Sequence, residues 1–236
     1  MAEITTVLLH GAGLDSWVWE PVIDEMTSPA VALDVPSRRV GVTPASCAAE
    51  LAAELNGRGM DAIVLVAHSL AGVLIPGMAS LLGPRLKHCV YLAAVVPPVG
   101  GSFVDALGFV NRVVLRLLFK FNPKGLKPSP SMIRRDLCNG LDDRSADLVV
   151  ERYAAEFPGL YLSPVDKGPV PSGATYIKLL KDRSVSPALQ DSMIARLGNP
   201  RVKVIDAGHL AMLSAPSEIA AILDDVAVEL VNWEAG

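Results

Sequence analysis

The stretch 61–72 constrains the fold of this chain more than any other. Residues 62–67 form a continuous apolar run rich in β-branched side chains, which is typical of a strand buried on both faces. A helical pattern follows at once, over residues 70–82. Between the two, Ala67-His-Ser-Leu-Ala71 nearly matches G-x-S-x-G, the nucleophile elbow, in which a sharp turn lifts a serine hydroxyl out of the sheet. Ser69 is therefore a candidate nucleophile.

A serine in this position could instead only cap the following helix, because serine is a favoured N-cap residue. The strand–turn–helix context favours the elbow, which needs small residues two places before and two places after the serine. Ala67 and Ala71 stand at those places, and Gly72 adds room one step later. We interpret the neighbouring His68 as a packing residue and not as the catalytic base.

Apolar runs separated by helical patterns recur along the chain. They predict repeated βαβ units and an α/β fold with a mostly parallel sheet flanked by helices. The expected strands are Ile4–His10, Ala30–Val35, Ala62–Ala67, His88–Val96, Ala174–Leu180 and Arg201–Ile205.

After Pro97-Pro98 the pattern becomes helical, with prolines dividing the segments. We therefore expect residues 97–171 to form a helical cap, inserted between core segments 1–96 and 172–236. Phe103–Phe121 is apolar but carries five charged or amide side chains, which predicts one amphipathic helix and not a membrane span.

Composition narrows the class of protein. The 236 residues, 51% hydrophobic, suffice for one α/β domain, and a net charge of −4 with no basic patch argues against nucleic acid as a partner. The three cysteines are far apart in sequence and suggest reduced core thiols, with neither a disulfide framework nor a metal site. The N-terminus shows no signal-peptide pattern. We expect a cytoplasmic protein without a membrane partner, and a homodimer stays open.

A serine hydroxyl needs an adjacent base, and the base needs an orienting acid. Where a nucleophile elbow supplies the serine, the acid typically follows it in sequence and the histidine comes last. His209 alone among the four histidines follows Ser69 at the exit of a late strand, and Gly208 gives its loop freedom to turn. Asp182 follows the expected strand Ala174–Leu180 and is the predicted acid. Asp206 is a fallback for that role.

Asp166 is a weaker candidate acid, since it falls at the exit of the cap. The sequence around Asp182 could also be an ordinary solvated charge cluster.

Two backbone amides must form the oxyanion hole, one from the residue after the nucleophile and one from the loop after the first strand. Leu70 and Ala12 occupy those positions.

The chain resembles the α/β-hydrolase superfamily, and more narrowly the plant methylesterase and hydroxynitrile lyase group. The resemblance rests on several stretches outside the cap. These are Leu8-Leu-His-Gly-Ala12 with Trp17-Val-Trp19, Val66–Gly72, Tyr91-Leu-Ala-Ala94, Tyr176-Ile177 with Asp182, Pro187 and Gln190, and Ala207–Leu213 with Pro216.

The resemblance implies Ser69 as nucleophile, Asp182 as acid and His209 as base. The lyases of the group typically have threonine after the first-strand histidine and lysine beside the catalytic histidine. This chain has Gly11 and Leu210 there, which points to the esterase side.

We therefore expect a carboxylesterase-type serine hydrolase that cleaves a small or medium apolar ester through an acyl-enzyme, with neither metal nor organic cofactor. Substrate contacts are expected from Gly11, Trp17, Leu107 and Leu210. Three alternatives stay open: a hydroxynitrile lyase or another acid–base lyase, a hydrolase of a lactone, amide or carbon–carbon bond, and a ligand-binding receptor on the same scaffold.

Overall fold

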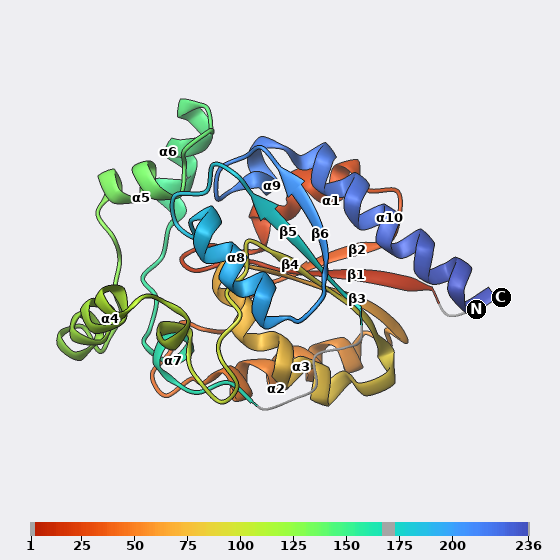
Figure 1. Ribbon diagram of the computed structural model, residues 1–236, viewed down its shortest axis with the longest axis horizontal. Helices are drawn as coiled ribbons and strands as arrows, with labels where there is room; N and C mark the ends of the chain where they lie inside the picture. The colour runs from red at the N-terminus through yellow and green to blue at the C-terminus, as the bar shows by residue number, and fades with distance from the viewer. Residues whose placement is uncertain (1–2, 167–172, 236) are drawn as a thin grey trace.

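The centre of the molecule is a six-stranded sheet in the order β2-β1-β3-β4-β5-β6 (Figure 1). The computed structural model describes residues 3–166 and 173–235, and within them all neighbouring strands pair in parallel. The strands are β1 (Ile4–Leu9), β2 (Ala30–Leu33), β3 (Ala62–His68), β4 (Leu86–Leu92), β5 (Ala174–Leu179) and β6 (Arg201–Ile205). The α/β-hydrolase fold predicted from the sequence is confirmed.

The central strand β3 is buried on both faces because its alternate side chains enter two separate hydrophobic clusters. Ile63 and Leu65 belong to the first cluster, and Val64 and Val66 belong to the second. A strand that contributes to both layers must be apolar at every position, which explains the unbroken run in the sequence.

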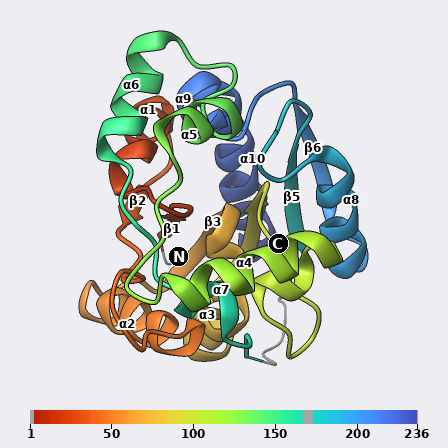
Figure 2. The same cartoon turned by 90° about the vertical axis from the view of Figure 1, so that its left-hand side faces the viewer.

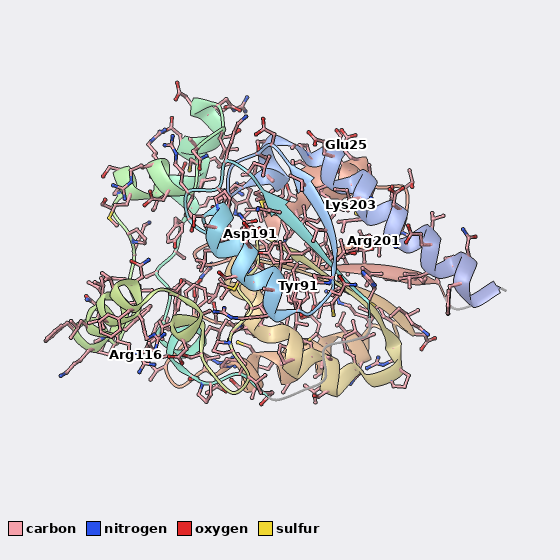
Figure 3. All side chains as sticks on the ribbon, viewed as in Figure 1. Glu25, Tyr91, Arg116, Asp191, Arg201 and Lys203 are labelled. Atoms are coloured by element: carbon pink, nitrogen blue, oxygen red, sulfur yellow. The ribbon has the colours of Figure 1, made fainter. Side chains whose placement is uncertain are left out.

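Helices cover both faces of the sheet (Figure 1). Helices α2 (Pro44–Gly57), α3 (Ile75–Leu82) and α8 (Pro187–Arg196) contribute to the first cluster. Helices α1 (Glu20–Glu25), α9 (Ala211–Ser214) and α10 (Pro216–Ala235) lie on the other face, where α1 and α10 pack together. Figure 3 labels Tyr91 of β4 near the middle of the molecule, and its side chain is buried in the first cluster.

Several element ends differ from the sequence prediction by one to several residues, and two of these differences have a clear physical cause. Strand β4 stops at Leu92, short of Val96, because Ala93 turns into the left-handed region with φ 42°. The amide of Val95 then donates to the carbonyl of Ser69 at 2.9 Å. After the elbow, a 3-10 helix (Ser69–Leu74) precedes α3, because Pro76 in the first turn of α3 has no N–H to donate.

Between β4 and β5 lies an insert, residues 93–173, whose described part is helical. It contains η4 (Phe103–Ala106), α4 (Phe109–Phe121), α5 (Pro130–Asp136), α6 (Asp143–Arg152) and α7 (Gly159–Leu162). The single helix predicted over Phe103–Phe121 is wrong: Leu107 is extended and Gly108 caps α4, so the chain turns there. Figure 2 shows α4 running across the face turned to the viewer.

The insert shares the core of the sheet domain. Ile133, Ala146 and Val149 belong to the second hydrophobic cluster, and Leu160 belongs to the first. The predicted boundary between residues 171 and 172 lies outside the described residues. No helix in the described part of the chain is long and apolar enough to cross a membrane.

Candidate active site

Ser69 stands at the turn directly after β3 in a strained backbone conformation. Its φ is +54°, a region that L-residues other than glycine rarely adopt. The turn also needs space, because a Cβ on Gly72 would lie 2.2 Å from the carbonyl oxygen of Val95. Gly72, one residue after the predicted small residue Ala71, therefore permits the close approach between the elbow and the segment that follows β4.

Three side chains that are distant in sequence meet at the carboxyl edge of the sheet. The Oγ of Ser69 lies 3.0 Å from Nε2 of His209, and Nδ1 of His209 lies 2.7 Å from Oδ2 of Asp182. All three residues are buried. An ionised carboxylate only accepts, so Nδ1 carries the proton in the neutral imidazole and Nε2 is free to accept from the serine hydroxyl. This is the tautomer that a general base requires.

Asp182 is fixed by backbone donors. Its Oδ1 accepts from the amides of Ser184 and Val185, each at 2.8 Å. The loop itself is held by the buried side chain of Gln190, whose Nε2 donates to the carbonyls of Leu179 and Val185. Asp182 therefore presents its other oxygen to the histidine in a single orientation.

The two alternative acids lie elsewhere. The carboxylate of Asp206 is exposed and pairs with Nζ of Lys181 at 2.6 Å. The carboxylate of Asp166 lies beside α3, where a Cβ on Gly77 would be 2.9 Å from it. Only Asp182 of the three reaches the ring of His209.

His68 supports the loop that carries His209. Its Nε2 donates to the carbonyl of His209 at 3.1 Å, and the two ring centroids are 4.6 Å apart. Burial lowers the pKa of His68 well below its ordinary value, and the nearby His209 lowers it further. A neutral His68 keeps a second positive charge away from His209.

His10 ends the first strand and holds two loops together. Its Nδ1 donates to the carbonyl of Gly11 at 2.8 Å, and its Nε2 accepts from the amide of Val35 at 2.8 Å. Burial lowers the pKa of His10. Ligand atoms of His10, Asp15 and Asp34 lie within 4.8 Å of one another. Both ring nitrogens are engaged in hydrogen bonds, so we assign no metal to this group.

A cavity of about 420 Å³ opens at the serine. Ala12 and Leu70, the predicted oxyanion donors, both line it beside Ser69 and His209. Leu107, predicted to contact substrate, also lies in its wall. The remaining wall is mainly apolar. Most of it comes from the insert, with Leu14 from the loop after β1, Val185 from the loop after β5 and Leu189 from α8; the insert residues include Phe103, Val114, Leu115, Leu118, Met132, Ile133, Leu137, Tyr153 and Tyr161.

Three predicted substrate contacts lie outside that wall. Leu210 is 1% exposed and packs in the second hydrophobic cluster. Trp17 stacks under Arg152, whose guanidinium carbon lies 5.0 Å from the ring centroid. A Cβ on Gly11 would lie 2.9 Å from Cβ of Ser69, so Gly11 serves close packing beneath the serine. We correct these three assignments to structural roles.

Sequence reasoning missed Glu156, which comes from the insert and is 1% exposed. Its Oε1 accepts from the amide of Gly13 at 2.8 Å, and its Oε2 accepts from Oγ of Ser37 at 2.9 Å. Nε of Arg38 donates to Oε1 at 3.3 Å. Gly13 directly follows Ala12, so Glu156 fixes the loop that offers one predicted oxyanion amide. The only sequence signal was a carboxylate within the apolar stretch 153–157.

Comparison with known proteins places the chain in a family. Residues 6–222 match the family model described as "Alpha/beta hydrolase family". The chain belongs to the alpha/beta hydrolase family. A probable hydrolase of Phoma sp. is 27% identical over 219 residues, which cover 84% of this chain and 86% of that protein. A carbendazim-hydrolyzing esterase of Nocardioides sp. is 29% identical over 119 residues, or 43% of this chain and 46% of that protein.

Solved structures share the family fold. An extracellular α/β-hydrolase from a Paenibacillus species superposes with a TM-score of 0.85 at 16% identity, covering 94% of this chain and 98% of the other. A methylesterase from Arabidopsis gives a TM-score of 0.70 at 20% identity, covering 94% and 98%. The resemblance to the α/β-hydrolase superfamily, noted in the sequence, is confirmed, and the plant methylesterase shares its fold.

Proposed function

We propose that this alpha/beta hydrolase is a serine carboxylesterase acting through an acyl-enzyme. The observation that carries the proposal is the continuous hydrogen-bonded chain from Ser69 Oγ to His209 Nε2 and from His209 Nδ1 to Asp182, at 3.0 and 2.7 Å. Relatives described as a hydrolase and an esterase support the same reaction class.

Each side chain has one role in the proposed reaction. His209 takes the proton of Ser69 as the serine oxygen attacks the ester carbonyl carbon, and the amides of Ala12 and Leu70 stabilise the resulting oxyanion. His209 then donates that proton to the leaving alcohol. In deacylation His209 removes a proton from water as the water attacks the acyl carbon. The bond between that carbon and Ser69 Oγ then breaks, His209 returns the proton to Oγ, and the carboxylic acid leaves. Asp182 keeps Nδ1 protonated and stabilises the imidazolium.

The cavity favours an apolar substrate of small or medium size. Its volume of about 420 Å³ lies in the range of small-molecule sites, and its wall is largely apolar. The carboxylate of Asp136 in the wall is paired with Arg135 at 2.7 Å, so it is not a free counter-charge for a cationic substrate. We expect esters of short aliphatic or aromatic acids to be hydrolysed faster than cationic ones.

The test uses p-nitrophenyl acetate and butyrate with the native chain, Ser69→Ala and Ser80→Ala. Ser80 is an exposed serine on α3 and serves as the matched control. We expect Ser69→Ala to lose turnover by at least about a thousandfold, since it removes the nucleophile, and Ser80→Ala to keep it. Ester hydrolysis that survives in Ser69→Ala would refute the proposal.

Two further assays separate the alternatives. Cleavage of mandelonitrile by a chain that does not hydrolyse esters would favour the lyase. Tight binding of a small apolar ligand without turnover of any ester would favour a receptor.

A further inference from the structure

Helix α4 of the insert presents a broad apolar face to solvent. Four side chains at helical spacing form what we call the outer face: Val110, Val113, Leu117 and Phe121. Val110 and Phe121 are 70% and 76% exposed. The opposite side of the helix is anchored by Phe119, whose ring is buried and lies 4.9 Å from the ring of Tyr161. An exposed apolar face of this extent on a soluble domain marks an interaction surface.

Basic residues outnumber acidic ones around α4, although Arg112, Arg116, Arg134 and Arg135 pair with carboxylates. Residues 106–135 contain seven arginines and lysines and no aspartate or glutamate, in a chain whose net charge is −4. Arg116 pairs with Asp105 at 3.0 Å; Figure 3 labels Arg116 at the edge of the molecule where α4 lies. Lys120, Lys124 and Lys127 are exposed and have no acidic partner among the described residues.

The outer face lies on the same helix as part of the active-site cavity wall. Asn111, Val114, Leu115 and Leu118 of the same helix line that cavity. Successive residues of a helix point in different directions, so α4 shows one edge to the cavity and the outer face to its surroundings. Figure 1 shows α4 at one side of the molecule, away from the sheet, and Figure 2 shows the same helix on the face turned to the viewer. A surface that covers the outer face would therefore contact a helix that also forms part of the cavity wall.

These observations favour an anionic lipid surface as the occupant. Amphipathic helices with aromatic and aliphatic side chains on one face and lysine and arginine beside it lie in the lipid–water interface. Basic residues near such a surface are attracted by acidic headgroups. A second copy of the chain docked here would bring two clusters of unpaired lysines together, and like charges across an interface are unfavourable.

We propose that α4 docks the protein on an anionic lipid surface. The outer face enters the boundary between headgroups and acyl chains, and Lys120, Lys124 and Lys127 face the acidic headgroups. This replaces the sequence-based expectation of no membrane partner. It goes beyond the proposed esterase function and does not depend on it, because lipid binding requires neither Ser69 nor ester turnover.

Co-sedimentation of the full chain with vesicles tests the proposal. We expect binding to phosphatidylcholine vesicles containing phosphatidylglycerol, weaker binding to phosphatidylcholine alone, and release as salt concentration rises. Lys120→Glu combined with Lys124→Glu should weaken binding to the anionic vesicles by about tenfold or more. Phe121→Asp should weaken binding to both kinds of vesicle.

The control is Val228→Asp, which changes an exposed valine on α10 and should bind vesicles like the native chain. None of the changed residues lines the cavity, and the far-UV circular dichroism spectrum of each variant reports that it is folded. Equal binding with and without phosphatidylglycerol would overturn the proposal. So would a native dimer that Phe121→Asp converts to a monomer, because the outer face would then belong to a second copy.

Discussion

At the scale of single residues, the backbone at Ser69 is strained, and contacts elsewhere in the site must stabilise its conformation. A non-glycine residue at φ +54° costs about 1–2 kcal/mol relative to the right-handed region. The conformation persists because β3 and α3 fix both sides of the turn and the Ser69 carbonyl accepts from Val95. Strain of this kind is found at functional sites.

Glycine at position 69 should relieve this strain. We expect Ser69→Gly to have a free energy of unfolding about 1 kcal/mol higher than Ser69→Ala, since only alanine keeps a Cβ at positive φ. Both variants lose the hydroxyl and should lose ester hydrolysis. Urea denaturation of the two variants gives the comparison directly. An alanine variant as stable as the glycine variant would show that position 69 is not strained.

Gly208, before the predicted base, is required for space and not for unusual backbone angles. A Cβ there would lie 1.9 Å from the carbonyl oxygen of Asn139 in the insert. We expect Gly208→Ala to displace the His209 loop and to lower kcat by about 10- to 100-fold, because small misplacements of a catalytic group are costly. Gly57→Ala, at a glycine whose Cβ would meet nothing within 4 Å, is the control for kcat. Full activity of Gly208→Ala would contradict the assignment.

At the scale of elements, the insert reaches into the loop after β1 and fixes its shape. The amide of Ala154 donates to the carbonyl of Gly13 at 2.9 Å, and Glu156 accepts from the amide of Gly13 at 2.8 Å. A group held in this way needs little reorganisation when charge develops in the transition state. The insert therefore shapes the predicted oxyanion site as well as the cavity wall.

Glu156→Gln tests this arrangement. The amide weakens the contacts to Gly13 and Arg38, so we expect kcat for p-nitrophenyl butyrate to fall by about tenfold or more, with KM nearly unchanged. The free energy of unfolding should fall by about 1–3 kcal/mol, since buried donors lose a charged partner. The control is Glu229→Gln, which breaks an exposed ion pair with Arg201. It should leave kcat and the free energy of unfolding unchanged. A rise in KM with kcat intact would place Glu156 in substrate binding.

The elements themselves were largely predictable. β6 (Arg201–Ile205) has the predicted bounds, and the other strands differ at their ends by one to several residues. The insert was harder to predict, because its helices are short and divided by prolines and glycines. The Leu107-Gly108 break within the apolar stretch 103–121 is an example, since the hydrophobic pattern continues across it.

At the scale of the whole molecule, buried histidines link stability to pH. Burial lowers the pKa of His10 and His68, and it lowers the pKa of His88 to about 4. Below about pH 6.5 the unfolded chain binds protons that the folded chain does not, so the folded state loses stability as pH falls. Carboxylates with a lowered pKa, such as Asp224, add a further loss only below about pH 4.

We therefore expect the free energy of unfolding in urea to be level above about pH 7 and to fall between pH 6.5 and 4.5. Each neutral buried histidine contributes a slope of up to about 1.4 kcal/mol per pH unit in that window. His68→Asn should reduce the slope, because it removes one of these groups. A stability that is constant from pH 7 to pH 5 would show that the histidines protonate equally well in the folded chain.

The sequence alone determined the order of strands and helices, the turn at Ser69 and the succession of serine, acid and histidine. The elements could be predicted because the periodicity of apolar residues records which face each element buries, whereas the succession of the three residues was implied by the resemblance to the α/β-hydrolases. The tertiary structure decided which residues meet: Asp182 and not Asp206 at His209, Glu156 at Gly13, and Leu210 in the core. Such contacts join positions far apart in sequence. They depend on packing in three dimensions, which no local sequence pattern encodes.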